Sequence, residues 1–152
     1  MTKREILEFL ELIPDWRTVL DGIERIRLHG GSDKWDGLYR HFEKEETGCI
    51  WLSAWQCNLT LEITKSYFNE HRSIFDRIEL KFERKKDVVI CWFDEGKAKA
   101  FTLVHVLLHE LGHHVDSRQR SFCASGEPYA EGFAKRLEDE VWSKYIKKFG
   151  KP

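Results

Sequence analysis

The stretch HVLLHELGHHVD, residues 105–116, places four histidines, one glutamate and one aspartate among apolar residues. The apolar residues of this region recur at helical spacing and predict a largely buried helix over residues 98–116. Burying imidazole and carboxylate groups costs several kcal/mol unless a partner compensates them. A bound metal ion would be one such compensation.

Within this helix, His109, Glu110 and His113 form the pattern HExxH. Successive residues of an α-helix are about 100° apart, so His109 and His113 lie one turn apart on nearly the same face. That spacing lets two imidazoles bind one zinc ion (Zn2+), while the glutamate between them acts as general base on the attacking water. The opposite side of the helix is apolar and is expected to be buried: Phe101, Val104, Leu108, Leu111 and Val115.

The glutamates of EPYAEGFAKRLEDE are candidates for a third zinc ligand, because two histidines and a water leave tetrahedral zinc one ligand short. Glu127, Glu131 and Glu138 recur at helical spacing around a predicted helix at 128–148, which Pro128 begins. A solvated acidic face accounts for Glu138. Glu127 and Glu131 lie at the anchored start of the helix, and this position makes them the better ligand candidates.

HELGH followed by EPYAEGFAKRL resembles the gluzincin group of zinc metallopeptidases, whose third ligand is a glutamate on a later helix. The second segment is similar to the E-x-x-A-[D/E/N]-x-F-A pattern of the ImmA/IrrE, CaaX prenyl protease and anthrax lethal factor types. The resemblance covers residues 101–138, about a quarter of the chain. It implies that Glu127 binds zinc and that Glu131 orients the imidazole of His109.

Two alternatives to this ligand set remain open. AEGFAKRLE also resembles the NEGFA segment of zinc aminopeptidases, which would make Glu131 the ligand and leave Lys135 in the position that orients His109. A carboxylate suits that orienting position and an ammonium group does not, so we favour Glu127. Asp116 lies on the same helix face as His109 and is expected to ligate, to support a histidine or to cap the helix end. His105, one turn before His109, is expected beside it or at the rim of the site.

The rest of the chain predicts strands followed by helices. Hydrophobic periodicity indicates a helix at 3–13, strands at 22–31, 48–55 and 58–63, and a β-hairpin at 77–93. This order indicates an α+β single domain over residues 1–152, with an N-terminal helix, a small antiparallel or mixed sheet, the HExxH helix and a C-terminal helix. With the gluzincin resemblance, the expected fold is zincin-like.

The resemblance also implies where a substrate would bind. Zincins hold the substrate chain against an edge strand that precedes the HExxH helix, and the last strand of the hairpin is the candidate: Val88, Val89, Ile90, Cys91 and Trp92. Tyr129, Arg118 or His71 would stabilise the oxyanion. We therefore predict a zinc-dependent peptidase of narrow specificity acting on a peptide or protein. The alternative is a catalytically inactive zincin-fold module that uses the metal structurally.

Composition excludes several other classes of function. Lys and Arg total 25 against 26 Asp and Glu, so no bulk charge is available to attract nucleic acid or an anionic membrane. The first residues lack the apolar run of a signal peptide or an anchor. The four cysteines, Cys49, Cys57, Cys91 and Cys123, contain no CxxC pair and are expected to be free thiols in the cytoplasm.

Overall fold

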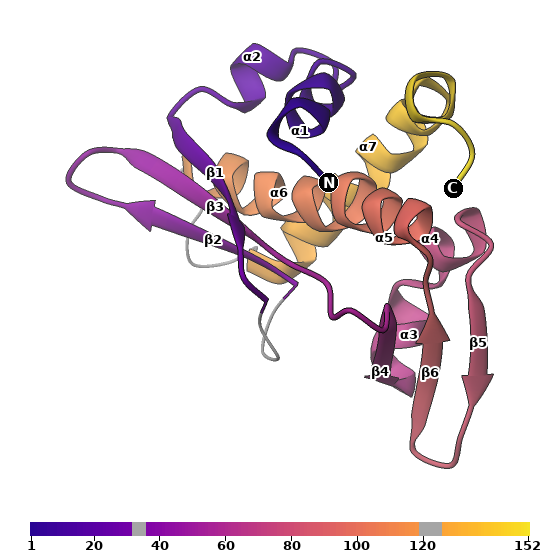
Figure 1. The fold of residues 1–152 in the computed structure, drawn as a ribbon. Helices are drawn as coiled ribbons and strands as arrows, with labels where there is room; N and C mark the ends of the chain where they lie inside the picture. The colour runs from indigo at the N-terminus through magenta and orange to yellow at the C-terminus, as the bar shows by residue number, and fades with distance from the viewer. Residues whose placement is uncertain (32–35, 119–125) are drawn as a thin grey trace.

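The computed structural model describes residues 1–31, 36–118 and 126–152, which form helices and two three-stranded sheets (Figure 1). This arrangement confirms the predicted α+β class. The helices are α1 (Lys3–Leu10), α2 (Trp16–Val19), α3 (Lys65–Glu70), α4 (Arg72–Arg77), α5 (Glu95–Phe101), the π-helical η1 (Thr102–Val106), α6 (Leu107–Arg118) and α7 (Gly126–Phe149). The strands are β1 (Ile23–His29), β2 (Gly37–Phe42), β3 (Thr47–Ser53), β4 (Thr60–Thr64), β5 (Lys81–Arg84) and β6 (Val88–Trp92).

The first sheet is mixed and has the order β1-β3-β2. Strand β3 is central, pairing in parallel with β1 and antiparallel with β2. Both β2 and β3 contact α6, and the sheet lies across this helix in Figure 1. Strand β2, which sequence periodicity did not predict, is therefore an edge strand beside the HExxH helix.

The second sheet is antiparallel, with the order β4-β6-β5, and includes the predicted hairpin. Its topology corrects one prediction: Val88–Trp92 forms the central strand of the sheet. Both sides of β6 are paired, so its backbone has no free edge for a substrate. The hairpin is also shorter than expected, because Ile78 and Leu80 are buried in the turn after α4, where Glu79 has a positive φ of 51°.

The predicted helix around HExxH runs as α5, η1 and α6 without interruption. It begins at Asp94, whose side chain accepts a hydrogen bond from the Lys97 N–H at 2.8 Å. In η1 the helix widens into a π turn, a feature that often lies at functional sites. Thr102 stabilises this turn because its Oγ1 donates to Ala98 O and accepts from Trp55 Nε1, both at 2.9 Å.

Helix α7 packs against α6, and the point of contact is Gly112. A Cβ atom at Gly112 would lie 2.7 Å from Ala130 Cα and 3.0 Å from Ala130 O, so only glycine permits this approach. The helix begins at Gly126, two residues before the predicted start. The predicted apolar stripe is buried, as expected: Ala130, Phe133, Leu137, Val141 and Tyr145.

Helix α1 lies above α6 in Figure 1 and packs on α7 through Phe9 and Tyr145. Thr2 and Glu5 form a capping box at its start, and Ile6, Phe9 and Leu10 are buried. Along the parts of the chain that the structure describes, no helix combines the length and apolarity needed to cross a membrane. Three of the cysteines are free thiols (Cys49, Cys57 and Cys91), while Cys123 lies outside the described residues.

Candidate metal centre

His109, His113 and Glu127 converge at the junction of α6 and α7. One donor atom from each of the three residues lies within 4.8 Å of the others. His109 Nε2 lies 3.1 Å from Glu127 Oε2, and His113 Nε2 lies 3.4 Å from Glu127 Oε1. The fold therefore brings together the three residues that the sequence proposed as ligands, across the crossing of two helices.

The spacing of these donor atoms fits a tetrahedral zinc ion. Zinc binds imidazole nitrogen and carboxylate oxygen at about 2.0–2.2 Å, which separates neighbouring donors by roughly 3.3–3.5 Å in a tetrahedron. The distances of 3.1 and 3.4 Å, each from one imidazole Nε2 to a different oxygen of Glu127, are close to that value, and one donor from each residue lies within 4.8 Å of the others. His109, His113 and Glu127 would hold the ion and leave its fourth position open, as in catalytic sites.

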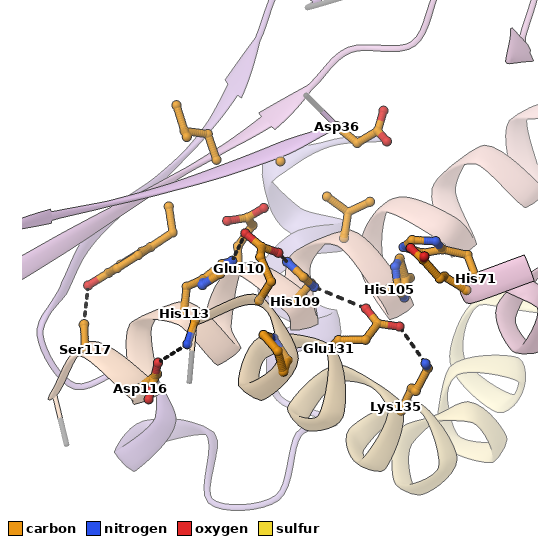
Figure 2. A pocket seen from close by; sticks show the side chains of 18 of the residues that line it. Asp36, His71, His105, His109, Glu110, His113, Asp116, Ser117, Glu131 and Lys135 are labelled. Atoms are coloured by element: carbon orange, nitrogen blue, oxygen red, sulfur yellow. Dashed lines mark hydrogen bonds and ion pairs between the residues drawn. The ribbon is translucent and has the colours of Figure 1, made fainter. Parts of the chain in front are cut away.

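Glu131 lies behind His109, one turn along α7 from Glu127. Its Oε2 is 3.4 Å from His109 Nδ1. This nitrogen is buried and has no hydrogen-bond partner. Lys135 Nζ lies 2.9 Å from the other carboxylate oxygen (Figure 2). With His109 Nε2 turned to a metal, its Nδ1–H would point at Glu131, the arrangement that fixes the orientation of a ligating imidazole.

Glu110 is buried between α6 and β2, with 6% of its surface exposed. Its carboxylate accepts a hydrogen bond from the backbone N–H of Tyr39, and burial raises the pKa of Glu110 to about 7. Gly37 allows this position: a Cβ there would lie 2.6 Å from Glu110 Oε1 and 2.7 Å from Val106 Cγ1. Strand β2 thus fixes the carboxylate that the sequence predicted as general base.

The charges around the centre favour a cation. Burial opposes protonation of His109, but Glu131, Glu110 and Glu127 together raise its pKa. Burial and the neighbouring His109 lower the pKa of His113. Burial disfavours the charged form of Glu131, yet His109 and Lys135 lower its pKa to about 2. Neutral His113 and ionised Glu131 are the protonation states that metal binding requires.

A cavity of about 940 Å³ opens over the centre. Its wall includes β2, the start of α7 and His71, whose pKa is lowered by burial and by His105. Of the three residues proposed to stabilise an oxyanion, the lining contains His71 but neither Tyr129 nor Arg118. Arg118 instead pairs with Asp21 at 2.5 Å.

The structure places three further polar residues of the sequence analysis: Asp116, His105 and Glu138. Asp116 Oδ2 accepts the backbone N–H of Gly126 at 3.1 Å, so it joins the end of α6 to the start of α7. His105 is not at a rim: it is 3% exposed, and its Nδ1 lies 2.7 Å from Glu138 Oε1. Glu138, expected on a solvated face, is 1% exposed, because α7 turns it toward η1.

Sequence reasoning missed the residues that shape the centre without reacting. Gly37 and Tyr39 place Glu110, and Gly112 sets the distance between α6 and α7. Gly112 carried a signal, since a glycine inside a buried helix often marks a close contact. Gly37 carried none, because its contact with Glu110 spans 73 positions and exists only in the fold.

Comparison with known proteins adds no assignment. No protein-family model, curated protein or solved structure matches the chain.

Proposed function

We propose that this protein is a zinc-dependent peptidase with a zincin-like fold of the gluzincin type. One observation supports the proposal above others: His109, His113 and Glu127 converge on one point, and Glu110 lies beside them under the edge strand β2. A purely structural zinc site has closed coordination and no use for an adjacent base. Here a buried carboxylate and a large cavity adjoin the three donors.

The residues divide the chemistry among them. A zinc ion bound by His109, His113 and Glu127 would acidify a water molecule and polarise the scissile carbonyl. Glu110 accepts the proton of the attacking water and later donates it to the leaving amine. The Tyr39 N–H holds the Glu110 carboxylate in place during both transfers. Gly37 leaves room for this carboxylate because it has no side chain.

Strand β2 is the part of the protein that we propose binds the substrate. It is paired with β3 on one side only, and its residues Gly37, Tyr39 and His41 line the cavity. Backbone groups of an edge strand pair readily with an extended peptide. This proposal replaces β6, which is central in its sheet.

The Glu110→Gln variant tests the proposal, because it keeps the size of the side chain but removes the proton acceptor. We expect zinc content and thermal stability near those of the wild type, and cleavage reduced by at least ~10²-fold. Cleavage is measured by mass spectrometry on a randomised peptide library with zinc-loaded protein. If the zinc-loaded wild type cleaves no peptide of the library, and if the wild type and Glu110→Gln bind some of these peptides with equal affinity, the protein is a binding module.

The Gly37→Ala variant tests the placement of Glu110 without altering it chemically. The new Cβ would overlap Glu110 Oε1 at 2.6 Å, so the carboxylate must move. A displacement of about 1 Å in a catalytic group costs on the order of 10²-fold in rate, while zinc affinity should stay unchanged. Gly132→Ala is the matched control, because a Cβ there meets no atom within 4 Å.

A further inference from the structure

A second polar cluster lies at the far end of the cavity and begins with the buried pair His105 and Glu138. His105, in η1, is 3% exposed, and Glu138, in α7, is 1% exposed. Their contact, Nδ1 to Oε1 at 2.7 Å, assigns the Nδ1 proton of His105 to the carboxylate. The lone pair of His105 Nε2 is then the one left for a ligand. Carboxylate–histidine pairs of this kind support metal-binding imidazoles.

His71 repeats this arrangement from another element. It lies between α3 and α4, and its Nδ1 donates to the backbone carbonyl of Tyr67 at 2.8 Å. Its ring stacks on the Tyr67 ring with centroids 3.9 Å apart, so its orientation is fixed. The rings of His71 and His105 face each other edge to face, with centroids 4.6 Å apart. Each imidazole therefore leaves Nε2 available.

Glu131 completes the cluster. One nitrogen of His71, one nitrogen of His105 and one carboxylate oxygen of Glu131 lie within 4.8 Å of one another. Figure 2 shows the two imidazoles side by side near this carboxylate. Glu131 Oε1 is buried and forms an ion pair with Lys135 Nζ at 2.9 Å. Two imidazole lone pairs and an anion repel one another unless a cation lies between them.

We propose that His71, His105 and Glu131 bind a second zinc ion. Two imidazole nitrogens and one carboxylate oxygen are a typical zinc ligand set and leave a position open toward the cavity. The three donor atoms lie within 4.8 Å of one another, and small side-chain movements would bring them to the roughly 3.3–3.5 Å that separates neighbouring ligands of tetrahedral zinc. Glu138 holds the His105 ring from behind, and the Tyr67 carbonyl holds that of His71.

The two zinc sites share Glu131. Its Oε2 is 3.4 Å from His109 Nδ1, so the carboxylate that orients a ligand of the first ion also binds the second. Lys135 places a positive charge 2.9 Å from the same carboxylate. Because this charge opposes a cation at the second site and Glu131 is divided between two tasks, the second ion binds more weakly than the first.

Zinc stoichiometry of the full chain tests the second site. Metal-free protein is titrated with Zn2+ beyond two equivalents by isothermal titration calorimetry, and bound metal is then measured by mass spectrometry. We expect two ions in the wild type, one in His71→Ala and one in His113→Ala, and none in the double variant. His29→Ala, which changes an exposed histidine of β1, should keep two. A thermal melt of each variant shows whether it is folded. The more conservative His71→Gln should lose the same ion, which excludes loss of folding as the cause of the lower zinc content.

Several outcomes would overturn this proposal. A wild type that saturates at one ion, lost in His113→Ala, would mean that the cluster of His71, His105 and Glu131 binds no metal. Two ions in both the wild type and His71→Ala would place the second ion elsewhere. By contrast, a wild type that binds a single ion, kept in His113→Ala and lost in His71→Ala, would support the second site and contradict the first.

Discussion

Glu127 and Glu131 lie one turn apart on α7, yet their surroundings give them different tasks. The Glu127 side chain is 77% exposed and its two oxygens face His109 Nε2 and His113 Nε2. The Glu131 side chain is 23% exposed and faces the other nitrogen of His109. A carboxylate beside both Nε2 atoms is placed to share their ion, and a carboxylate beside Nδ1 is placed to orient the ring.

Replacing each glutamate by alanine should separate these tasks. We expect Glu127→Ala to lose more than ~10²-fold in affinity for the first zinc equivalent, since it removes a ligand. Glu131→Ala should lose roughly 10–100-fold, the usual cost of removing the partner of a ligating histidine. Chelator competition with one equivalent of zinc measures both, with exposed Glu140→Ala as the control. The opposite order of losses would make Glu131 the ligand.

Individual residues differ in how far the sequence could place them. The i, i+4 spacing of His109 and His113 follows from helix geometry alone, and so their shared face was predictable. The pairing of His105 with Glu138 joins residues 33 positions apart and depends on how α7 turns against η1. An acidic residue in a Glu-rich helix reads as solvated, and only the packing of two helices shows that Glu138 is buried.

Among the elements, the crossing of α6 and α7 determines the geometry of the first site. Gly112 belongs to the HExxH helix and lies against Ala130, between the α7 positions of Glu127 and Glu131. The absent side chain lets the two backbones approach until the glutamates reach His109 and His113. The distance between the helices, and with it the donor spacing, therefore depends on one glycine.

The Gly112→Ala variant should damage both stability and metal binding. Its Cβ would lie 2.7 Å from Ala130 Cα, a backbone atom that can move only if the helices separate. We expect a loss of about 1–3 kcal/mol in the free energy of unfolding, the usual cost of overpacking, together with weaker zinc binding. Urea denaturation and chelator competition measure the two effects. Gly132→Ala, on the exposed face of α7, should be neutral or stabilising; equal stability in both variants would contradict this account of the crossing.

The elements that the sequence predicted are those with strong periodicity. Helices around 98–116 and 128–148 and the hairpin that ends at Phe93 carry regular apolar patterns, and the structure contains all three. The short helices α3 and α4 were missed because each spans six residues, fewer than two turns. The position of β6 within its sheet could not be inferred, because strand order depends on which partners β4 and β5 choose.

At the scale of the whole molecule, the N-terminal helix ties the HExxH helix to the C-terminal helix. Phe9 of α1 packs on Tyr145 of α7 with ring centroids 6.3 Å apart. Lys99 of α5 reaches Glu5 of α1 at 2.9 Å, and Lys144 of α7 donates to Leu12 O at 3.1 Å. These contacts join residues 94 to 136 positions apart, so α1 and the residues just after it stabilise the two helices that carry the proposed ligands.

The Glu5–Lys99 pair makes part of this stability depend on pH. The hydrogen bond from Lys99, followed by that from Thr2, lowers the pKa of Glu5 from 4.5 to about 2. A carboxyl group with a lowered pKa in the folded state stabilises the protein above its unfolded pKa, and this contribution is lost as the pH falls from about 4.5 to 2. Because the pair is partly exposed, solvent screening limits its contribution to about 1 kcal/mol.

The Glu5→Gln variant isolates this contribution, since glutamine still caps the Thr2 N–H but carries no charge for Lys99. We expect metal-free Glu5→Gln to unfold at lower urea concentration than the wild type at pH 7. The difference should shrink as the pH falls below 4.5 and vanish as the pH falls through about 2, where Glu5 of the folded wild type itself becomes protonated. Glu11→Gln, an exposed change just after α1, should show no such dependence. If the Glu5→Gln difference were the same at pH 7 and pH 2.5, the stabilisation would come from packing of α1 and not from this ion pair.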